Sequence, residues 1–111
     1  MIEVHSQPVI EPDPSGGWQL MFWIGRAFDY TTPFRKALDD MTKVLSRKQR
    51  CSIELPEYEA NEDFVEGTLQ LGDQVLRIYY EHSLSYLSLS TSSREFLGDV
   101  SALLQASVKV I

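Results

Sequence analysis

The chain has 111 residues, of which 43% are hydrophobic and 11% aromatic, and it contains one cysteine. This length and apolar content predict a single domain, residues 1–111, whose core needs neither a disulfide nor a structural metal. The net charge of −6 disfavours direct binding to nucleic acid or anionic lipid, because both require concentrated lysine and arginine.

Two strands are predicted in the first quarter of the chain. Residues 2–4 alternate between apolar and polar, and Pro8 confines this strand to an edge or an early end. Residues 11–17 (EPDPSGG) have the composition of a turn. Residues 18–25 (WQLMFWIG) then predict a strand that is apolar on both faces, which favours a central position. In an alternative interpretation, Trp23 is exposed and contacts a partner.

A helix is predicted next, with Thr32 as its N-cap and Pro33 in its first turn. Apolar residues recur at helical spacing over residues 34–45. Basic residues gather near the C-terminal end of this segment: Lys43, Arg47, Lys48 and Arg50. Cations are favourable at that end of a helix, so we interpret the cluster in this way rather than as a nucleic-acid site.

The strongest local pattern in the chain is a β-hairpin. A strand over residues 51–55 ends at Pro56, and a loop follows it. Residues 64–71 and 74–81 then flank Gly72-Asp73, a two-residue turn with glycine first. The register set by this turn places Val65, Gly67, Leu69, Leu71, Gln74, Leu76, Ile78 and Tyr80 on one face. Polar residues occupy the other face.

The last third of the chain predicts a strand and a second helix. Residues 84–90 alternate like a strand. Ser92, with Glu95 three residues later, has the spacing of a capping box that opens a helix. The tail, residues 105–111, either frays or adds an edge strand through its two valines. The fold class is therefore α+β, with the order ββαββββα. We expect a mostly antiparallel sheet of about five to six strands, with both helices packed on one face.

The chain carries no complete set of residues for catalysis or for binding a metal or a cofactor. Its two histidines, His5 and His82, belong to no metal-spaced cluster, and no phosphate-binding glycine loop or nucleophile elbow is present. We therefore expect no enzyme activity, no metal and no cofactor. The best enzymatic alternative is Glu81 with His82 as general acid and base. Neighbours in a strand point to opposite faces, so a turn would have to bring the two together.

The sequence also gives an expectation for location. The first eight residues, MIEVHSQP, lack the charged and apolar regions of a secretory signal. The longest apolar stretch, residues 20–24, is far shorter than the roughly 20 residues that span a bilayer. We expect a cytoplasmic protein that does not contact a membrane.

An acidic segment dominates the charge pattern. Six carboxylates and no basic residue lie between Glu54 and Glu66. Clustered carboxylates repel one another unless a counter-charge is near, so they predict contact with a cationic partner. A merely solvated loop is the alternative. The predicted partner-binding residues are the footprint Glu57, Tyr58, Glu59, Glu62 and Asp63, and a second patch on the polar face of the hairpin, Glu66, Tyr79, Glu81, His82 and Tyr86.

Residues 67–95 resemble the small immunity proteins of bacterial toxin systems, above all those of contact-dependent growth inhibition. The matching pattern is a hairpin ending in Tyr-Tyr-Glu-His, then Ser-Tyr-Leu-Ser, then Ser-Arg-Glu opening a helix. The resemblance implies a cytoplasmic protein that binds one cognate toxin domain, commonly a nuclease, and blocks its active site or substrate surface. It implies no shared catalytic residues and no particular fold. A nuclease surface is basic, which fits the acidic segment.

We therefore hypothesise a toxin-neutralising immunity protein. The rival hypotheses are a small enzyme that uses Glu81 and His82, and a non-catalytic subunit or adaptor of a larger complex with Trp23 at its interface.

Overall fold

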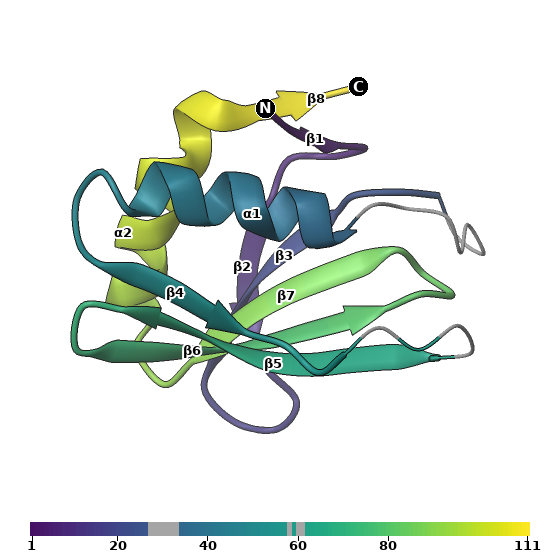
Figure 1. Cartoon of the computed structure of the whole chain (residues 1–111), viewed down its shortest axis with the longest axis horizontal. Coiled ribbons are helices and arrows are strands. Elements are labelled where there is room, and N and C mark those ends of the chain that lie inside the picture. Colours follow the sequence, from purple (N-terminus) through teal and green to yellow (C-terminus); the bar gives the residue numbers. More distant parts are fainter. Residues whose placement is uncertain (27–33, 58, 60–61) are drawn as a thin grey trace.

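A six-stranded antiparallel sheet with the strand order β2-β3-β7-β6-β5-β4 lies at the centre of the computed structural model (Figure 1). The structure describes residues 1–26, 34–57, 59 and 62–111. The strands of this sheet are β2 (Val9–Pro12), β3 (Trp18–Trp23), β4 (Cys51–Glu54), β5 (Phe64–Leu71), β6 (Gln74–Glu81) and β7 (Tyr86–Thr91). The helices are α1 (Phe34–Leu45) and α2 (Arg94–Leu104), and a 3₁₀ turn, η1 (Gln105–Ser107), follows α2.

Both helices pack on the same face of the sheet, as the single apolar stripe on each one predicts (Figure 1). Their buried residues are Phe34, Leu38, Met41 and Leu45 in α1 and Leu97, Val100 and Leu104 in α2. These side chains meet the alternate, inward-pointing residues of the strands, such as Leu20, Leu76 and Leu87, which are fully buried. The α+β fold class is therefore confirmed.

The β5–β6 hairpin has the register that its turn predicts. Leu71 pairs with Gln74, and Val65 pairs with Tyr80. Gly72 has a φ of 60°, while Asp73 is not among the residues with positive φ. Positive φ at the first central residue alone is the pattern of a type II′ turn, which requires glycine there. The turn residues and the alternation of apolar residues predict the same register, so the sequence of the hairpin alone was enough to predict it.

The N-terminal segment differs from the prediction. β2 is a strand that the sequence did not predict: its residues Glu11 and Pro12 were expected to lie in a turn, but Pro12 pairs with Trp18 of β3. A proline is tolerated there because β2 is an edge strand, and an edge strand has a side that donates no ladder hydrogen bonds. The turn itself is residues 13–17, closed by a 3.0 Å hydrogen bond from Asp13 N to Gly17 O.

The first and last strands form a separate two-stranded parallel sheet. β1 (Ile2–Val4) pairs with β8 (Val108–Val110), which settles the open question of the C-terminal tail in favour of a strand. The backbone N–H of Ile111 donates to the carbonyl of Val4 over 2.8 Å. Ile2 and Val4 are buried in the hydrophobic cluster, so this small sheet is fixed to the core (Figure 1).

The second helix begins one residue later than predicted. Ser93 is the N-cap, and its Oγ accepts a 3.1 Å hydrogen bond from the backbone N–H of Phe96. The predicted capping box from Ser92 to Glu95 is therefore wrong, because the residue three positions after the true cap has no side-chain acceptor. The predicted cap of α1, Thr32, lies outside the described residues. Within the described residues, no helix combines the length and the apolar character that crossing a membrane requires.

Two glycines provide a matched test of this packing. A Cβ at Gly67 would collide with the carbonyl oxygen of Glu54 in β4, whereas a Cβ at Gly98 in α2 would meet open space. We expect Gly67→Ala to lower the free energy of unfolding by about 1–3 kcal/mol. We expect Gly98→Ala to raise it by about 0.5–1 kcal/mol, because alanine favours a helix. Urea denaturation measures both, and equal effects would contradict the close approach of β4.

Candidate functional site

The face of the six-stranded sheet that points away from the helices carries no helix in the described part of the chain (Figure 1). We call it the open face. Near one end of its strands lies a series of aromatic rings, Trp23, Tyr86, Tyr79 and Phe64, whose centroids are separated in turn by 5.1, 6.1 and 5.9 Å. We call these four residues the aromatic row. Strand alternation puts them on one face, because their neighbours Phe22, Leu87, Tyr80 and Val65 are buried under the helices.

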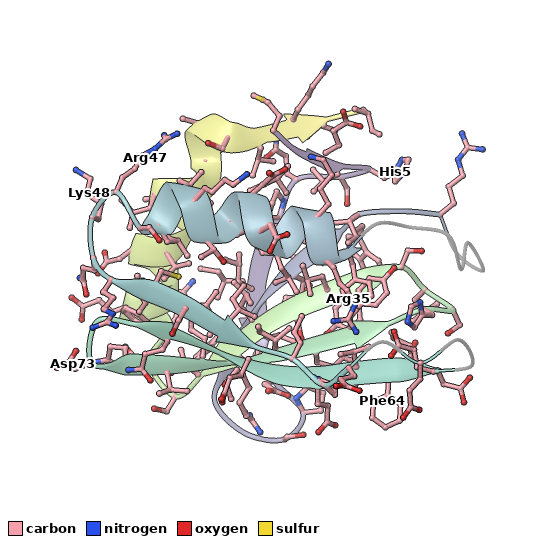
Figure 2. All side chains as sticks on the ribbon, viewed as in Figure 1. His5, Arg35, Arg47, Lys48, Phe64 and Asp73 are labelled. Carbon is pink, nitrogen blue, oxygen red and sulfur yellow. The ribbon has the colours of Figure 1, made fainter. Side chains whose placement is uncertain are left out.

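The aromatic row is partly exposed. Phe64 is 53% exposed, and the other three rings are half-buried. Figure 2 shows Phe64 pointing away from α1, while Arg35 points from α1 toward the sheet. Aromatic side chains with a packed body and an accessible edge are enriched in protein interfaces. Trp23 was predicted to lie in a central strand, with exposure at an interface as the alternative; β3 is indeed an internal strand, and the Trp23 ring is half-buried on its open side.

Carboxylates border the aromatic row, and one of them raises the pKa of a tyrosine in it. The Oε1 atom of Glu81 accepts a 3.1 Å hydrogen bond from the Tyr79 hydroxyl, and its Oε2 atom accepts a 3.3 Å hydrogen bond from Ser83. Burial raises the pKa of Tyr79, and this hydrogen bond raises it further. Glu66, opposite Tyr79 on β5, is exposed. The aromatic row therefore has neutral hydroxyls beside negative charge.

Tyr86 is held in a similar way. Its hydroxyl donates a 2.6 Å hydrogen bond to Gln19 Oε1 on β3. Burial is the main cause that raises the pKa of Tyr86; a hydrogen bond with Ser88 opposes it, and the negative charges of Asp13, Glu11 and Glu81 add to the rise. The negative charges that act on Tyr86 thus come from two parts of the chain, residues 11–13 and the end of β6.

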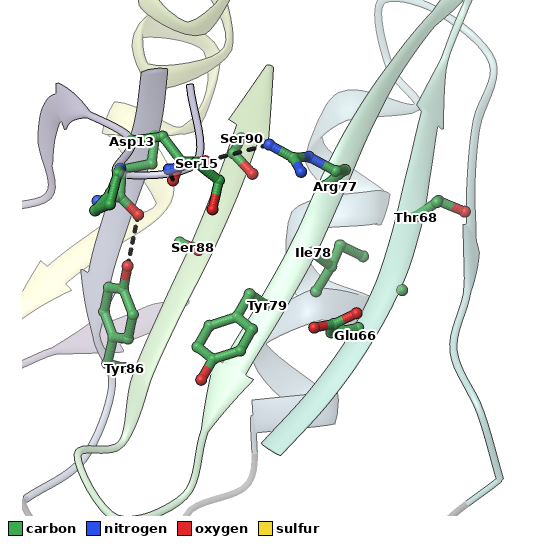
Figure 3. Close-up of a pocket in the computed structure, with 13 residues that line it drawn as sticks. Asp13, Ser15, Glu66, Thr68, Arg77, Ile78, Tyr79, Tyr86, Ser88 and Ser90 are labelled. Carbon is green, nitrogen blue, oxygen red and sulfur yellow. Dashed lines mark hydrogen bonds and ion pairs between the residues drawn. The ribbon is translucent and has the colours of Figure 1, made fainter. Parts of the chain in front are cut away.

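A hollow of about 600 Å³ lies in the open face beside the turn at residues 13–15 (Figure 3). Its described lining includes Asp13, Ser15, Gln19, Glu66, Thr68, Arg77, Tyr79, Tyr86, Ser88 and Ser90. The guanidinium of Arg77 reaches across to Asp13, with Nη2 3.3 Å from Oδ2. This ion pair ties the turn to β6 at the edge of the hollow.

The predicted acidic footprint is divided. Glu57, Glu59 and Asp63 are exposed, as predicted. Glu62 is different, because its side chain is 9% exposed, with Oε1 3.1 Å from His82 Nε2 and 3.8 Å from Arg35 Nη2. Its charge is compensated inside the protein, so it does not belong to the accessible footprint. Tyr58 lies outside the described residues.

His82 does not belong to the predicted second patch. It is 6% exposed, and its ring packs edge-on against Phe34 at 5.4 Å and Tyr80 at 5.0 Å, on the helix side of the sheet. Glu81 points to the open face and bonds Tyr79 instead. The acid–base pair of Glu81 and His82 is therefore not formed, because the two side chains follow the alternation of the strand. Glu66, Tyr79, Glu81 and Tyr86 do come together.

Sequence reasoning missed several members of this face. Phe64 joins the row although it was not among the predicted partner-binding residues, and Gln19 shares a face with Trp23 by the alternation of residues 18–23. Ser88 and Ser90 alternate with buried leucines in the same way. The Asp13–Arg77 ion pair had no sequence signal, because its partners are 64 residues apart.

Among the described residues, no three His, Cys, Asp or Glu side chains are grouped to hold a metal ion. Cys51 is half-buried, and burial raises the pKa of its thiol, which disfavours the reactive thiolate. Comparison of the chain with protein-family models, curated proteins and solved structures gave no match.

The contact between Glu62 and His82 can be measured by a double-mutant cycle with Glu62→Ala and His82→Ala. We expect a coupling free energy of about 1–3 kcal/mol, because the pair is buried and hydrogen-bonded. The exposed pair Lys36 and Asp40, 3.1 Å apart within α1, is the matched control, with an expected coupling of about 0.3–0.5 kcal/mol. A coupling for Glu62 and His82 no larger than the control would show that this contact does not anchor the acidic segment.

The electrostatics of the aromatic row can be tested at Tyr79. Glu81→Gln removes the negative charge of the carboxylate that accepts a hydrogen bond from the Tyr79 hydroxyl, so the pKa of Tyr79 should fall. It should stay above its ordinary value, because the hydroxyl remains partly buried. NMR of Cζ-labelled tyrosine across an alkaline titration resolves this residue. Glu95→Gln, on α2, should leave the pKa unchanged. A Tyr79 that titrates at its ordinary value in the unmodified protein would contradict the described burial.

Proposed function

We propose that this protein is an immunity protein that binds a basic toxin domain through the open face and the exposed part of the acidic segment. The observation that carries the proposal is the aromatic row, bordered by carboxylates and left uncovered by the helices. An uncovered aromatic surface of this kind is costly in water and is typical of a binding site.

Charge complementarity defines the partner. The four described ion pairs engage Glu62, Asp13 and Asp40. Among the described residues, no ion pair engages the exposed carboxylates Glu57, Glu59, Asp63 and Glu66. Unpaired carboxylates favour a cationic partner and accelerate its association by long-range attraction. The basic side chains Arg47 and Lys48 lie beyond the C-terminal end of α1, across the molecule from Phe64 (Figure 2).

A toxin nuclease is the cationic partner that this surface suits best. Its active-site surface must attract phosphates with lysine and arginine and often stacks bases on aromatic rings. Carboxylates can replace the phosphates, and the rings of the aromatic row can replace the stacked bases. Inhibition then needs occlusion alone and no chemistry by this protein. The resemblance of residues 67–95 to immunity proteins supports the same class.

The proposal places the protein in the cytoplasm, where an incoming nuclease domain meets its substrate. It assigns no direct contact with nucleic acid or membrane to this chain, because the exposed carboxylates would repel both. The rival adaptor role would use the same face, with Trp23 at the interface, but would not require a basic partner.

Charge reversal tests the proposal. In the test variant, lysine replaces Glu57, Glu59, Asp63 and Glu66, and Glu62 is kept because it contacts His82 and Arg35. We expect association with the basic toxin domain encoded beside this chain to slow by about tenfold or more, and protection of toxin-expressing cells to be lost. Surface plasmon resonance across a salt series measures the rate, and thermal denaturation confirms the fold.

The matched control carries the same change of charge elsewhere, with lysine at Glu3, Asp39, Asp73 and Asp99, which are all exposed. It should bind and protect like the unmodified protein. Undiminished binding by the test variant would remove these carboxylates from the mechanism. The lack of any adjoining basic toxin domain would contradict the immunity role itself.

A further inference from the structure

The hollow in the open face arises from the register of β7. Ser88 pairs with Met21 on one side and Tyr79 on the other, and Ser90 pairs with Gln19 and Arg77. The two serines, 3% and 6% exposed, form a low floor between larger side chains. The cavity of about 600 Å³ falls within the roughly 300–1,000 Å³ typical of ligand pockets. It has room for a complete long side chain and part of its backbone.

The charge of the lining selects a cation. Among the described residues that line the hollow, Asp13 and Glu66 are acidic and Arg77 is basic. Arg77 already contacts Asp13, with Nη2 3.3 Å from Oδ2. Glu66 has no described ion-pair partner and is exposed at the rim. An entering anion would meet Glu66 and a guanidinium that is already neutralised, whereas an entering cation would gain an unpaired carboxylate.

The shape and the hydrogen-bond acceptors of the lining favour one kind of cation over another. Tyr79 and Tyr86 present aromatic rings along one side of the hollow (Figure 3). A planar guanidinium stacks on such rings and spreads five N–H donors over several acceptors. Glu66 and the two serine hydroxyls offer those acceptors in different directions. A lysine ammonium is more strongly hydrated and has three donors, so it matches this lining less well.

We infer that this hollow receives an arginine side chain of the partner protein, stacked against Tyr79 or Tyr86 and paired with Glu66. The inference rests on the proposed function, because it names the partner group that anchors in the open face. It gives the surface a specific contact in addition to long-range attraction.

Titration of the isolated, ¹⁵N-labelled protein with N-acetyl-arginine methylamide tests the inference at constant ionic strength. We expect saturable shifts at the backbone amides of Arg77, Tyr79, Ser88 and Ser90. The lysine analogue should bind about tenfold more weakly, a difference of about 1.4 kcal/mol. The glutamate analogue should cause no shift in these residues.

Two variants on one strand provide the matched comparison. Thr68 lines the hollow and is exposed, while Gln70 lies two residues along β5 on the same face and does not line it. Thr68→Arg places a competing guanidinium beside Glu66, and we expect it to weaken arginine binding by about tenfold or more. Gln70→Arg adds the same charge outside the hollow and should change the affinity by less than about twofold. The ¹⁵N spectra confirm that both variants fold.

Several results would overturn the inference. The first is the absence of a saturable shift up to about 50 mM probe, because a ligand of this size that fits a pocket should have a lower dissociation constant than that. The others are shifts confined to residues 57–63, equal binding of the lysine analogue, and preference for the glutamate analogue. Equal weakening by both variants would also overturn it. None of these results affects the charge-reversal test with the toxin domain. Conversely, if that test fails while the arginine analogue binds in the hollow, the immunity role falls and the arginine site stands.

Discussion

The structure depends on one constraint: the six-stranded sheet has one continuous apolar face, and each of the two helices has a single apolar stripe to bury against it. Burial of the stripes drives both helices to the same face, where Leu38 of α1 and Val100 of α2 join the core. The opposite face then has no helix over it in the described part of the chain, so its own side chains meet the solvent. They include partly exposed aromatic rings and hydrogen-bonded phenols as well as polar groups. This is the physical origin of the candidate binding face.

The carboxylates divide into two groups with different tasks. Some hold the protein together: Glu62 contacts His82 and Arg35, and Asp13 contacts Arg77. Both of these contacts fix segments that border the open face. The exposed carboxylates of the acidic segment have no such partner among the described residues, and their repulsion is relieved when a cation approaches. Some carboxylates thus stabilise the fold through ion pairs, while the exposed ones of the acidic segment are accessible to a cation.

The sequence predicted those elements whose determinants are local. The β5–β6 hairpin follows from Gly72 and from alternation on either side of it, and both helices follow from their apolar stripes. The misses depend on distant neighbours. Pro12 fits a strand because β2 lies at an edge, and His82 is buried because Phe34 and Glu62 come from other elements to meet it. The hollow was not predictable, because it needs Asp13 of the turn at residues 13–17 to meet Arg77 of β6, which lies far along the chain.

The central claim is that the open face is the working surface, and hydroxyl-radical footprinting of the complex tests it most directly. Oxidation of Phe64, Tyr79 and Tyr86, quantified by mass spectrometry, should fall on binding to the basic toxin domain. Oxidation of Met1, which is 65% exposed and lies next to the two-stranded sheet, should not change. Protection of the outer surfaces of α1 and α2, with unchanged oxidation of the three aromatic residues, would contradict the account.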